Sequence, residues 1–220
     1  MTTPQTDSLE SAAADRAQTF IDWTKLKRGP LAIGAAVVVV AIIGFWFFNR
    51  LQQTKAAAAE RALLQAKQSM SAGNLQLAQS DLQKVYAQYA STGAGLEAGL
   101  LLAQIDYDQG KFQDGITRLD KIGSSGENAA TILSLKGDGY AQMGKAADAA
   151  KAYQAAADAT SFENEKAFQQ SKAARAFQAA GDTAKARELW TSILNDPKAQ
   201  SVAAEARVRL GELGAKPAGK

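Results

Sequence analysis

The residues of this sequence whose types and spacing come nearest to those of a catalytic site are two pairs of acidic residues. Asp106 and Asp108 lie two positions apart, as do Glu163 and Glu165, and paired carboxylates can serve as a general acid and a general base. Residues two apart point to different sides of a helix, so neither pair is expected to converge on one substrate. The sequence has no Gly-rich phosphate-binding loop to accompany them. Neither pair therefore predicts an enzyme.

Other common catalytic side chains are missing from the sequence. The chain contains no cysteine and no histidine. Thiolate nucleophiles, Ser-His-Asp triads, imidazole bases, disulfides and ordinary zinc sites are excluded for that reason. We expect no enzyme activity, no catalytic residue, no metal site and no cofactor.

The charge balance bears on the class of partner. Lys and Arg number 25, Asp and Glu number 22, and the formal net charge is +3. Basic residues alternate with acidic ones and form no long basic run, so nucleic acid is not an expected partner. A small-molecule substrate is not expected either. The expected partners are therefore polypeptides and a lipid bilayer.

The segment that determines where the rest of the chain lies relative to a membrane is the apolar run at residues 31–48, LAIGAAVVVVAIIGFWFF. As a helix it would be about 27 Å long, close to the thickness of one hydrocarbon core. A helix can cross alone because its backbone groups bond within the segment. We predict a transmembrane signal-anchor helix over residues 29–49. The alternatives are a buried helix of a soluble core and a cleaved signal peptide.

The flanks of this segment predict its direction. Lys25, Lys27 and Arg28 cluster before it, and an aromatic anchor, residues 46–48, closes its other end. The basic residues within about fifteen positions differ little in number between the two sides, so the tight cluster decides. We predict a cytoplasmic N-terminus and a translocated C-terminal body.

The first 28 residues and the last six are expected to lie outside the folded domain. Residues 1–20 are rich in Thr, Ser, Ala, Gln and Asp without apolar periodicity, which predicts disorder. Residues 20–28 fit either a short amphipathic helix at the lipid headgroups or an early start of the span. Residues 215–220 are predicted to form a flexible tail.

From residue 49 onward the sequence predicts helix nearly everywhere, interrupted by glycines at regular intervals. Gly73, Gly110, Gly144 and Gly181 are separated by 37, 34 and 37 residues. A period in this range is typical of arrays of helical hairpins. Each glycine can adopt the left-handed conformation that ends one helix, and Asn74 and Asp182 can cap the next.

Longer breaks separate the hairpins. Thr160 with Glu163, and Ser124 with Glu127, have the spacing of a capping box, and Asp196 before Pro197 is typical of a helix start. We predict an all-α domain over residues 50–214, a solenoid of four hairpins and a capping helix. The hairpins are expected at 57–91, 95–123, 128–160 and 164–195, and the cap at 197–214. Residues 49–71 are expected to continue the span as a stalk.

The third repeat resembles the tetratricopeptide repeat. The matching residues are Leu133, Gly137 and Tyr140 in the first helix, Gly144 in the turn, and Ala149, Tyr153 and Ala156 in the second helix. The other repeats match in part. The second departs from the pattern, because Gly115 replaces the small packing alanine and Asp106 replaces the usual tyrosine.

One span followed by degenerate repeats is similar to the family of the ancillary subunit of the Sec (SecYEG) translocon. The stretch GLEAGLLLAQIDYDQGKFQDGITRLDKI carries this resemblance beside the architecture. The resemblance implies a single-pass protein of the bacterial inner membrane. Its repeat domain would face the periplasm and contact the translocon and periplasmic chaperones.

A solenoid of this kind binds peptides or helices on the concave surface formed by the first helix of each pair. The repeat register places there Glu97, Gln104, Tyr107, Asp108, Asp138, Gln142, Lys172, Arg175 and Gln178. The alternative interpretation is that these are ordinary solvated positions. A clamp for a C-terminal carboxylate is not expected, because Lys172 and Arg175 stand without asparagines.

The hypothesis that follows is a membrane-anchored protein that docks protein partners and does no chemistry. The alternative is a structural or assembly scaffold subunit of another membrane complex, and a second rival is an enzyme with an unrecognised site.

Overall fold

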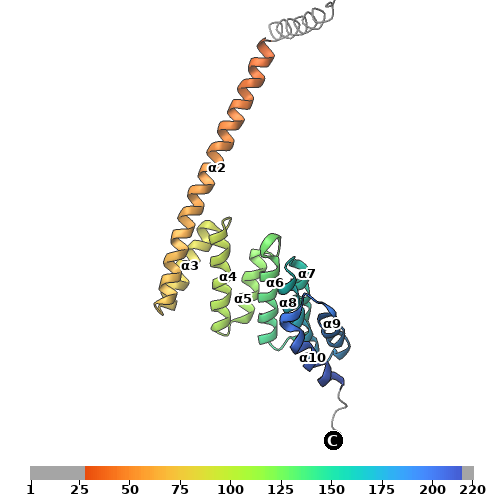
Figure 1. Cartoon of the computed structure of the whole chain (residues 1–220). Coiled ribbons are helices and arrows are strands. Elements are labelled where there is room, and N and C mark those ends of the chain that lie inside the picture. The colour runs from red at the N-terminus through yellow and green to blue at the C-terminus, as the bar shows by residue number, and fades with distance from the viewer. Residues whose placement is uncertain (1–27, 215–220) are drawn as a thin grey trace, which may run out of the picture. The chain divides into compact units, whose positions relative to one another are not determined.

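The computed structural model describes the backbone of residues 28–214 and the side chains of Gly34 and of the residues from Val37 onward (Figure 1). Within this range the chain forms nine α-helices, one 3₁₀ turn and no strand. The predicted all-α fold is confirmed. The expectations for residues 1–27 and 215–220 fall outside the described residues.

The helices follow one another with short connections. Their bounds are α2 Arg28–Ser71, α3 Leu75–Tyr89, α4 Gly93–Asp108, α5 Phe112–Ile122, η1 Gly126–Asn128, α6 Ala129–Gln142, α7 Ala146–Ala159, α8 Glu163–Ala179, α9 Thr183–Asn195 and α10 Gln200–Gly214. The chain divides into two units, Met1–Lys55 and Ala56–Lys220.

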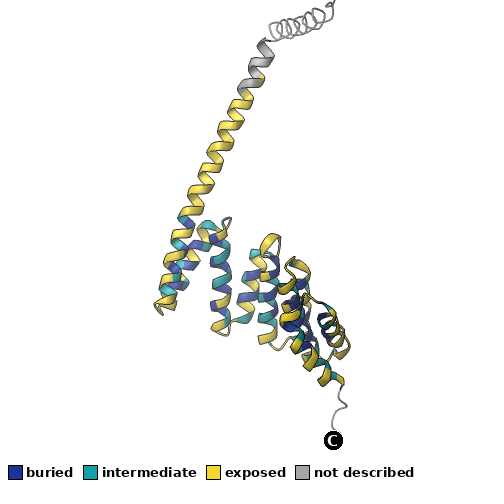
Figure 2. Cartoon of the chain, in the orientation of Figure 1, coloured by how far each residue is buried: buried dark blue, intermediate teal, exposed yellow. Residues whose placement is uncertain are grey.

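In the first unit the described part of α2 is apolar and unpacked. Its large side chains between Val37 and Phe48 are 53–72% exposed, and Figure 2 shows this stretch as exposed throughout. Among the described residues, one helix, α2 from Val37 onward, is long and apolar enough to cross a membrane. Its composition, rich in Ala, Val and Ile, suits a helix in lipid, where backbone groups must be satisfied within the segment.

The second unit is a row of helical hairpins. The last part of α2 shares a hydrophobic cluster with α3 and α4. The later pairs are α4 with α5, α6 with α7, and α8 with α9, while α10 packs on α8 and α9. The end of α2 is therefore the first helix of the first hairpin, because Ala59, Leu63 and Ala66 are buried against α3 and α4. The predicted solenoid of four hairpins with a terminal helix is confirmed.

The tight turns within the hairpins depend on glycine. Gly73, Gly110, Gly144 and Gly181 have φ values of 75°, 73°, 71° and 82°, a region that side chains with a Cβ rarely adopt. The predicted helix caps after two of them are confirmed. The Oδ1 atom of Asn74 accepts from the Leu77 backbone N–H, and that of Asp182 from the Lys185 N–H, each at 3.1 Å.

The connections between hairpins differ from the prediction in detail. Helix α8 begins at Glu163, and the hydroxyl of Thr160 donates instead to Glu165 at 2.7 Å, so the capping box with Glu163 was wrong. Helix α10 begins at Gln200, so Asp196 does not cap it and accepts from the Lys198 N–H instead. The Ser124 cap was also wrong. The next helical segment is the 3₁₀ turn η1, and the residue directly before it is Ser125. These loops are longer than expected, so each helix begins several residues after its expected cap.

One helix cap was not predicted. The Thr92 hydroxyl accepts from the Gly95 N–H at 3.1 Å and starts α4. Threonine is among the preferred residues at this position because its side-chain oxygen satisfies an N–H that the helix leaves free.

Three hydrophobic clusters hold the hairpins together. One joins α2, α3 and α4, and another joins α7, α8, α9 and α10. Between them a small cluster centres on Ala103, Leu119 and Ile132, which connects the second hairpin to the third.

Close approach of helices depends on small residues. A Cβ on Gly137 would lie 2.5 Å from the ring of Tyr153.

We expect the substitution Gly137→Leu to lower the free energy of unfolding by about 1–3 kcal/mol, because the added side chain would overpack the contact with Tyr153. Urea unfolding of the full chain in detergent micelles, followed by circular dichroism, measures this. Gly211→Ala is the matched control. A Cβ there meets no atom within 4 Å, so this change should be neutral or stabilising by up to about 1 kcal/mol. Equal effects of the two variants would contradict the assigned packing.

Candidate protein-binding groove

The nine predicted groove residues all lie on α4, α6 and α8, the first helices of successive hairpins. Four of them are exposed: Gln104, Asp108, Gln142 and Arg175. Five are partly buried: Glu97, Tyr107, Asp138, Lys172 and Gln178. Some of these side chains form ion pairs or hydrogen bonds within the protein, and the others keep free hydrogen-bonding groups.

The Lys172 ammonium group is the most heavily engaged of these groups. Its Nζ lies 2.6 Å from Asp138 Oδ1 and donates to the Ser134 hydroxyl at 3.1 Å. It also lies 4.5 Å from the centre of the Tyr153 ring, within cation–π range. The structure therefore brings Lys172 of α8 and Asp138 of α6 together as an ion pair across two hairpins.

Asp138 has a second partner in the core. The Tyr153 hydroxyl donates to Asp138 Oδ1 at 2.7 Å. Burial raises the pKa of Tyr153 above its ordinary value, and the hydrogen bond and negative charge of Asp138 raise it further. The phenol is therefore held neutral, where it can donate to the carboxylate.

Arg175 ties α8 to the terminal helix. Its Nε lies 2.7 Å from Glu205 Oε1, and its Nη2 lies 2.9 Å from Oε2 of the same carboxylate. This is the paired geometry in which a guanidinium binds a carboxylate most specifically. The same Nη2 also reaches the Ser171 hydroxyl at 3.3 Å. Arg175 is thus occupied by an internal partner.

At the other end of the row, Glu97 on α4 forms an ion pair with Lys67 on α2. The two side chains are about half exposed, so solvent screens this pair and its contribution to stability is small. No contact joins Glu97 or Gln104 directly to the Asp138 and Lys172 pair among the described residues.

Tyr107 is a packing residue more than a surface residue. Its ring lies against Gly115 and its hydroxyl against Gly139, where a Cβ on either glycine would clash, and the hydroxyl donates to the Leu135 carbonyl at 3.0 Å. The pKa of Tyr107 is raised above its ordinary value, mainly by burial and next by the negative charge of Asp138. Gly115, a departure from the repeat pattern, is therefore the residue that makes room for Tyr107.

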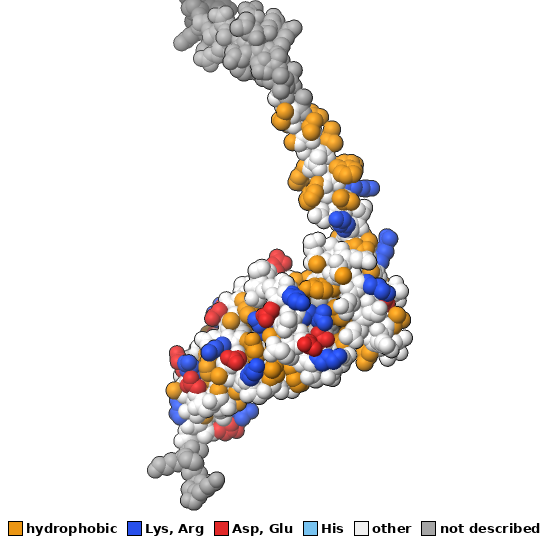
Figure 3. Space-filling view, turned by 180° about the vertical axis from the view of Figure 1, so that it is seen from behind, with side chains coloured by type: hydrophobic (Ala, Val, Ile, Leu, Met, Phe, Trp, Pro, Cys, Tyr) orange, Lys and Arg blue, Asp and Glu red, His pale blue; other side chains and the backbone are white. Residues whose placement is uncertain are grey.

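Four predicted residues keep free polar groups. Within the described part of the chain, the side chains of Gln104, Asp108, Gln142 and Gln178 make no hydrogen bond or ion pair of their own. A glutamine amide offers both a donor and an acceptor, which matches the N–H and C=O of an extended peptide. Figure 3 shows charges of both signs interspersed over the repeat domain. The arrangement favours recognition of a peptide backbone over a strongly charged ligand.

Two residues that lie against the Lys172 ammonium group, Ser134 and Phe168, were missed from the sequence. Ser134 lies four positions before Asp138, and Phe168 lies four before Lys172, so each shares a helix face with a predicted residue. Phe168 is 49% exposed, and its ring centre lies 5.8 Å from the Lys172 Nζ. The helical spacing was the signal that could have found them.

The two acidic pairs do not form shared sites. Asp106 is buried and accepts from Arg118 Nε at 2.9 Å, whereas Asp108 is exposed. Glu163 pairs with Lys198 at 3.2 Å, and Glu165 accepts from Thr160. Among the described residues, no group of three Asp, Glu, His or Cys side chains is placed to hold a metal ion.

Comparison with known proteins agrees with this architecture. A family model described as a tetratricopeptide repeat-like domain matches residues 54–173, more than half of the chain. A search of curated proteins found no match.

Two solved structures are similar in fold. Both come from a Podosopora anserina protein described as a kinesin light chain with nearly identical TPR-like repeats. The first has a TM-score of 0.54 and 19% identity, covering 71% of this chain and 89% of that chain. The second, a single-substitution variant of the same protein, has a TM-score of 0.54 and 18% identity, covering 71% and 88%. At this identity the likeness is one of fold alone.

We expect the stability of the repeat domain to fall as the pH rises above about 10, the ordinary pKa of tyrosine. The raised pKa values mean that the folded protein retains the phenolic protons of Tyr107 and Tyr153 when the unfolded chain has lost them. Their contribution is therefore fully present below about pH 10 and is lost progressively above it, by at most about 1.4 kcal/mol per pH unit for each tyrosine. Urea unfolding between pH 9 and 11.5 measures the slope. In Tyr153→Phe the slope should be shallower, and an unchanged slope would contradict the assignment.

Proposed function

The chain belongs to the tetratricopeptide repeat-like family, and we propose from this that it docks polypeptide partners while anchored in a membrane. Solenoids of this kind present the first helices of their hairpins as a binding surface. The observation that carries the proposal is the row of free side chains on those helices, namely Gln104, Asp108, Gln142 and Gln178. The charged neighbours Asp138, Lys172 and Arg175 are held in fixed positions by internal partners.

The anchor is the apolar part of α2. Its large side chains from Val37 to Phe48 are more than half exposed, and a contiguous apolar surface of this length is costly in water. Insertion in a bilayer removes that cost. Anchoring also raises the local concentration of the groove at the membrane, so that a partner held there binds without high intrinsic affinity.

The specific setting we propose is the bacterial inner membrane. The cluster of Lys25, Lys27 and Arg28 before the span supports a cytoplasmic N-terminus, with the repeat domain in the periplasm. The architecture of one span and degenerate repeats supports a role beside the Sec translocon and periplasmic chaperones. The nine groove residues are proposed as the docking surface, and the span and repeat boundaries predicted from the sequence are proposed as its domain limits.

A second candidate is a structural or assembly subunit of another membrane complex. The exposed apolar face of α2 favours this candidate equally, since it can pack against other transmembrane helices as well as against lipid. In that case the repeats would brace the complex, and a stoichiometric assembly would form.

Photo-crosslinking in living cells tests the docking proposal. A crosslinking amino acid at position 104 or 175, on the proposed groove, should capture a polypeptide, because both side chains are exposed there. The matched control is position 151 on α7, which is also exposed. Purification in mild detergent then separates the candidates. Translocon or chaperone subunits among the products support the first, whereas a stoichiometric complex without them supports the second. Equal capture from position 151 would contradict a groove on the first helices.

Protease treatment of spheroplasts tests the orientation. We expect the repeat domain to be digested together with a known periplasmic control, because the basic cluster before the span keeps the N-terminus in the cytoplasm. A repeat domain that stays intact while the control is degraded would contradict the proposed orientation. Digestion after detergent lysis shows that the protease can cut the domain.

A further inference from the structure

A pocket lies where the third and fourth hairpins meet, at the starts of α6 and α8. Its volume is about 450 Å³. Glu127 lines it from η1 and Ala130 from the first turn of α6, while Glu165 lines it from the first turn of α8. The other lining residues are the last residue of α7 and the connection that follows it, residues 159–162. The pocket therefore sits beside the first helices that carry the proposed groove.

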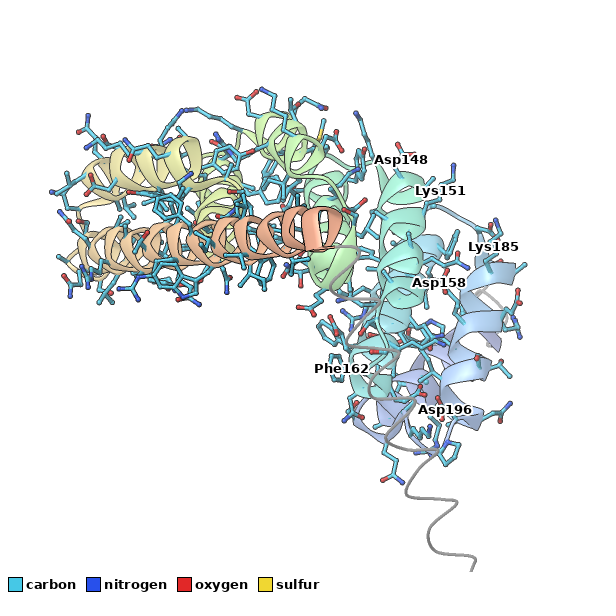
Figure 4. The ribbon with its side chains drawn as sticks, turned by 90° about the horizontal axis from the view of Figure 1, so that it is seen from above. Asp148, Lys151, Asp158, Phe162, Lys185 and Asp196 are labelled. Atoms are coloured by element: carbon cyan, nitrogen blue, oxygen red, sulfur yellow. The ribbon has the colours of Figure 1, made fainter. Side chains whose placement is uncertain are left out.

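Phe162 is held in an exposed position by its own backbone. Its side chain is 73% exposed. Its N–H donates to the Thr160 hydroxyl at 3.2 Å, and its carbonyl accepts from the Lys166 N–H at 2.8 Å. In Figure 4 Phe162 lies on the opposite side of the ribbon from Lys151 and Lys185, which belong to the second helices α7 and α9. An aromatic ring this exposed is available to contact an apolar group of a partner.

The charged groups of the pocket are both negative, and its other polar side chains are the neutral hydroxyls of Thr160 and Ser161. Glu127 is exposed and makes no hydrogen bond or ion pair among the described residues. Glu165 is partly buried, and one of its oxygens accepts from the Thr160 hydroxyl at 2.7 Å. Each carboxylate thus retains lone pairs that can accept from a further donor.

The basic residue nearest in sequence is Lys166, directly after Glu165; it is partly buried, does not line the pocket and forms no ion pair among the described residues. Two lysines farther along the chain are engaged with other carboxylates. Lys172 is bound to Asp138, and Lys198 is bound to Glu163. No described ion pair neutralises Glu127 or Glu165. A carboxylate-bearing ligand would be repelled here, and a cation would be attracted.

We propose that this pocket receives a lysine or arginine side chain of the polypeptide that the groove docks. The aliphatic stem of such a side chain would lie on the Phe162 ring while its charged end reaches Glu127 and Glu165. Phe168, farther along α8 and 49% exposed, would cover an apolar residue next to the basic one. The inference rests on the proposed docking function and names the chemistry of the partner: a basic residue beside an apolar residue.

The test uses the full chain in lipid nanodiscs and a bead-displayed library of random decapeptides. Bound beads are sequenced, and the wild-type protein should enrich peptides with Lys or Arg next to Leu, Ile or Phe. In the double variant Glu127→Gln, Glu165→Gln we expect this enrichment to fall roughly threefold to tenfold, the effect of losing two charge contacts that solvent screens at least in part. Glutamine at position 165 still accepts from Thr160, so the loop is expected to keep its fold.

The matched control is Asp148→Asn, Asp158→Asn, which removes the same charge from exposed positions of α7. This variant should enrich the same peptides as the wild type. Peptide binding without a basic preference, or a preference that survives in the Glu127 and Glu165 variant, overturns the inference and leaves the docking proposal standing. Absence of peptide binding by the wild type overturns both.

Discussion

The repeat domain depends on the close approach of helices at positions where a side chain would not fit. A single helical hairpin cannot bury its apolar face alone, so the hairpins must stack, and stacking requires large residues to face small ones. Gly137 accommodates the Tyr153 ring within the third hairpin, and Gly139 accommodates the Tyr107 hydroxyl between the second and third. Tyr153 then donates to Asp138. Packing inside the core therefore fixes the position of a carboxylate on the surface.

The edge of the first hairpin shows how the stack begins. Repeat-equivalent positions on later first helices hold buried residues, namely Ala98 with Ile105 and Ile132 with Gly139. In the first hairpin the same two positions hold Arg61 and Gln68, and both are exposed. Polar residues at this edge remove the apolar contact on which a preceding hairpin would pack, as is typical of terminal repeats in solenoids. The apolar segment that is long enough to cross a membrane and the first helix of the solenoid thus belong to one helix, α2.

The sequence predicted the features that arise locally. Glycine turns and the Asn74 and Asp182 caps depend on residues within one turn of each other, and all of them are present. The Thr160 cap failed because its hydroxyl accepts from the Phe162 N–H, which precedes the helix, and α8 begins only at Glu163. Tyr107 was assigned to the groove by register, yet its contacts with Gly139 and Leu135 come from another hairpin. Ion pairs such as Lys172 with Asp138 also join residues far apart in sequence, and a helical repeat pattern does not encode them.

Internal pairing limits what the groove can recognise. A partner carboxylate seeking Lys172 or Arg175 would have to displace Asp138 or Glu205, which already bind these cations with good geometry. Displacement would also leave the Asp138 carboxylate unpaired next to the buried Tyr153 ring, at a desolvation cost that the new contact would have to exceed. Acidic ligands are therefore disfavoured at the very residues whose charge would attract them. The proposed docking surface would then rely on groups that form no ion pair among the described residues: the glutamine amides for a peptide backbone, and Glu127 with Glu165 for a basic side chain.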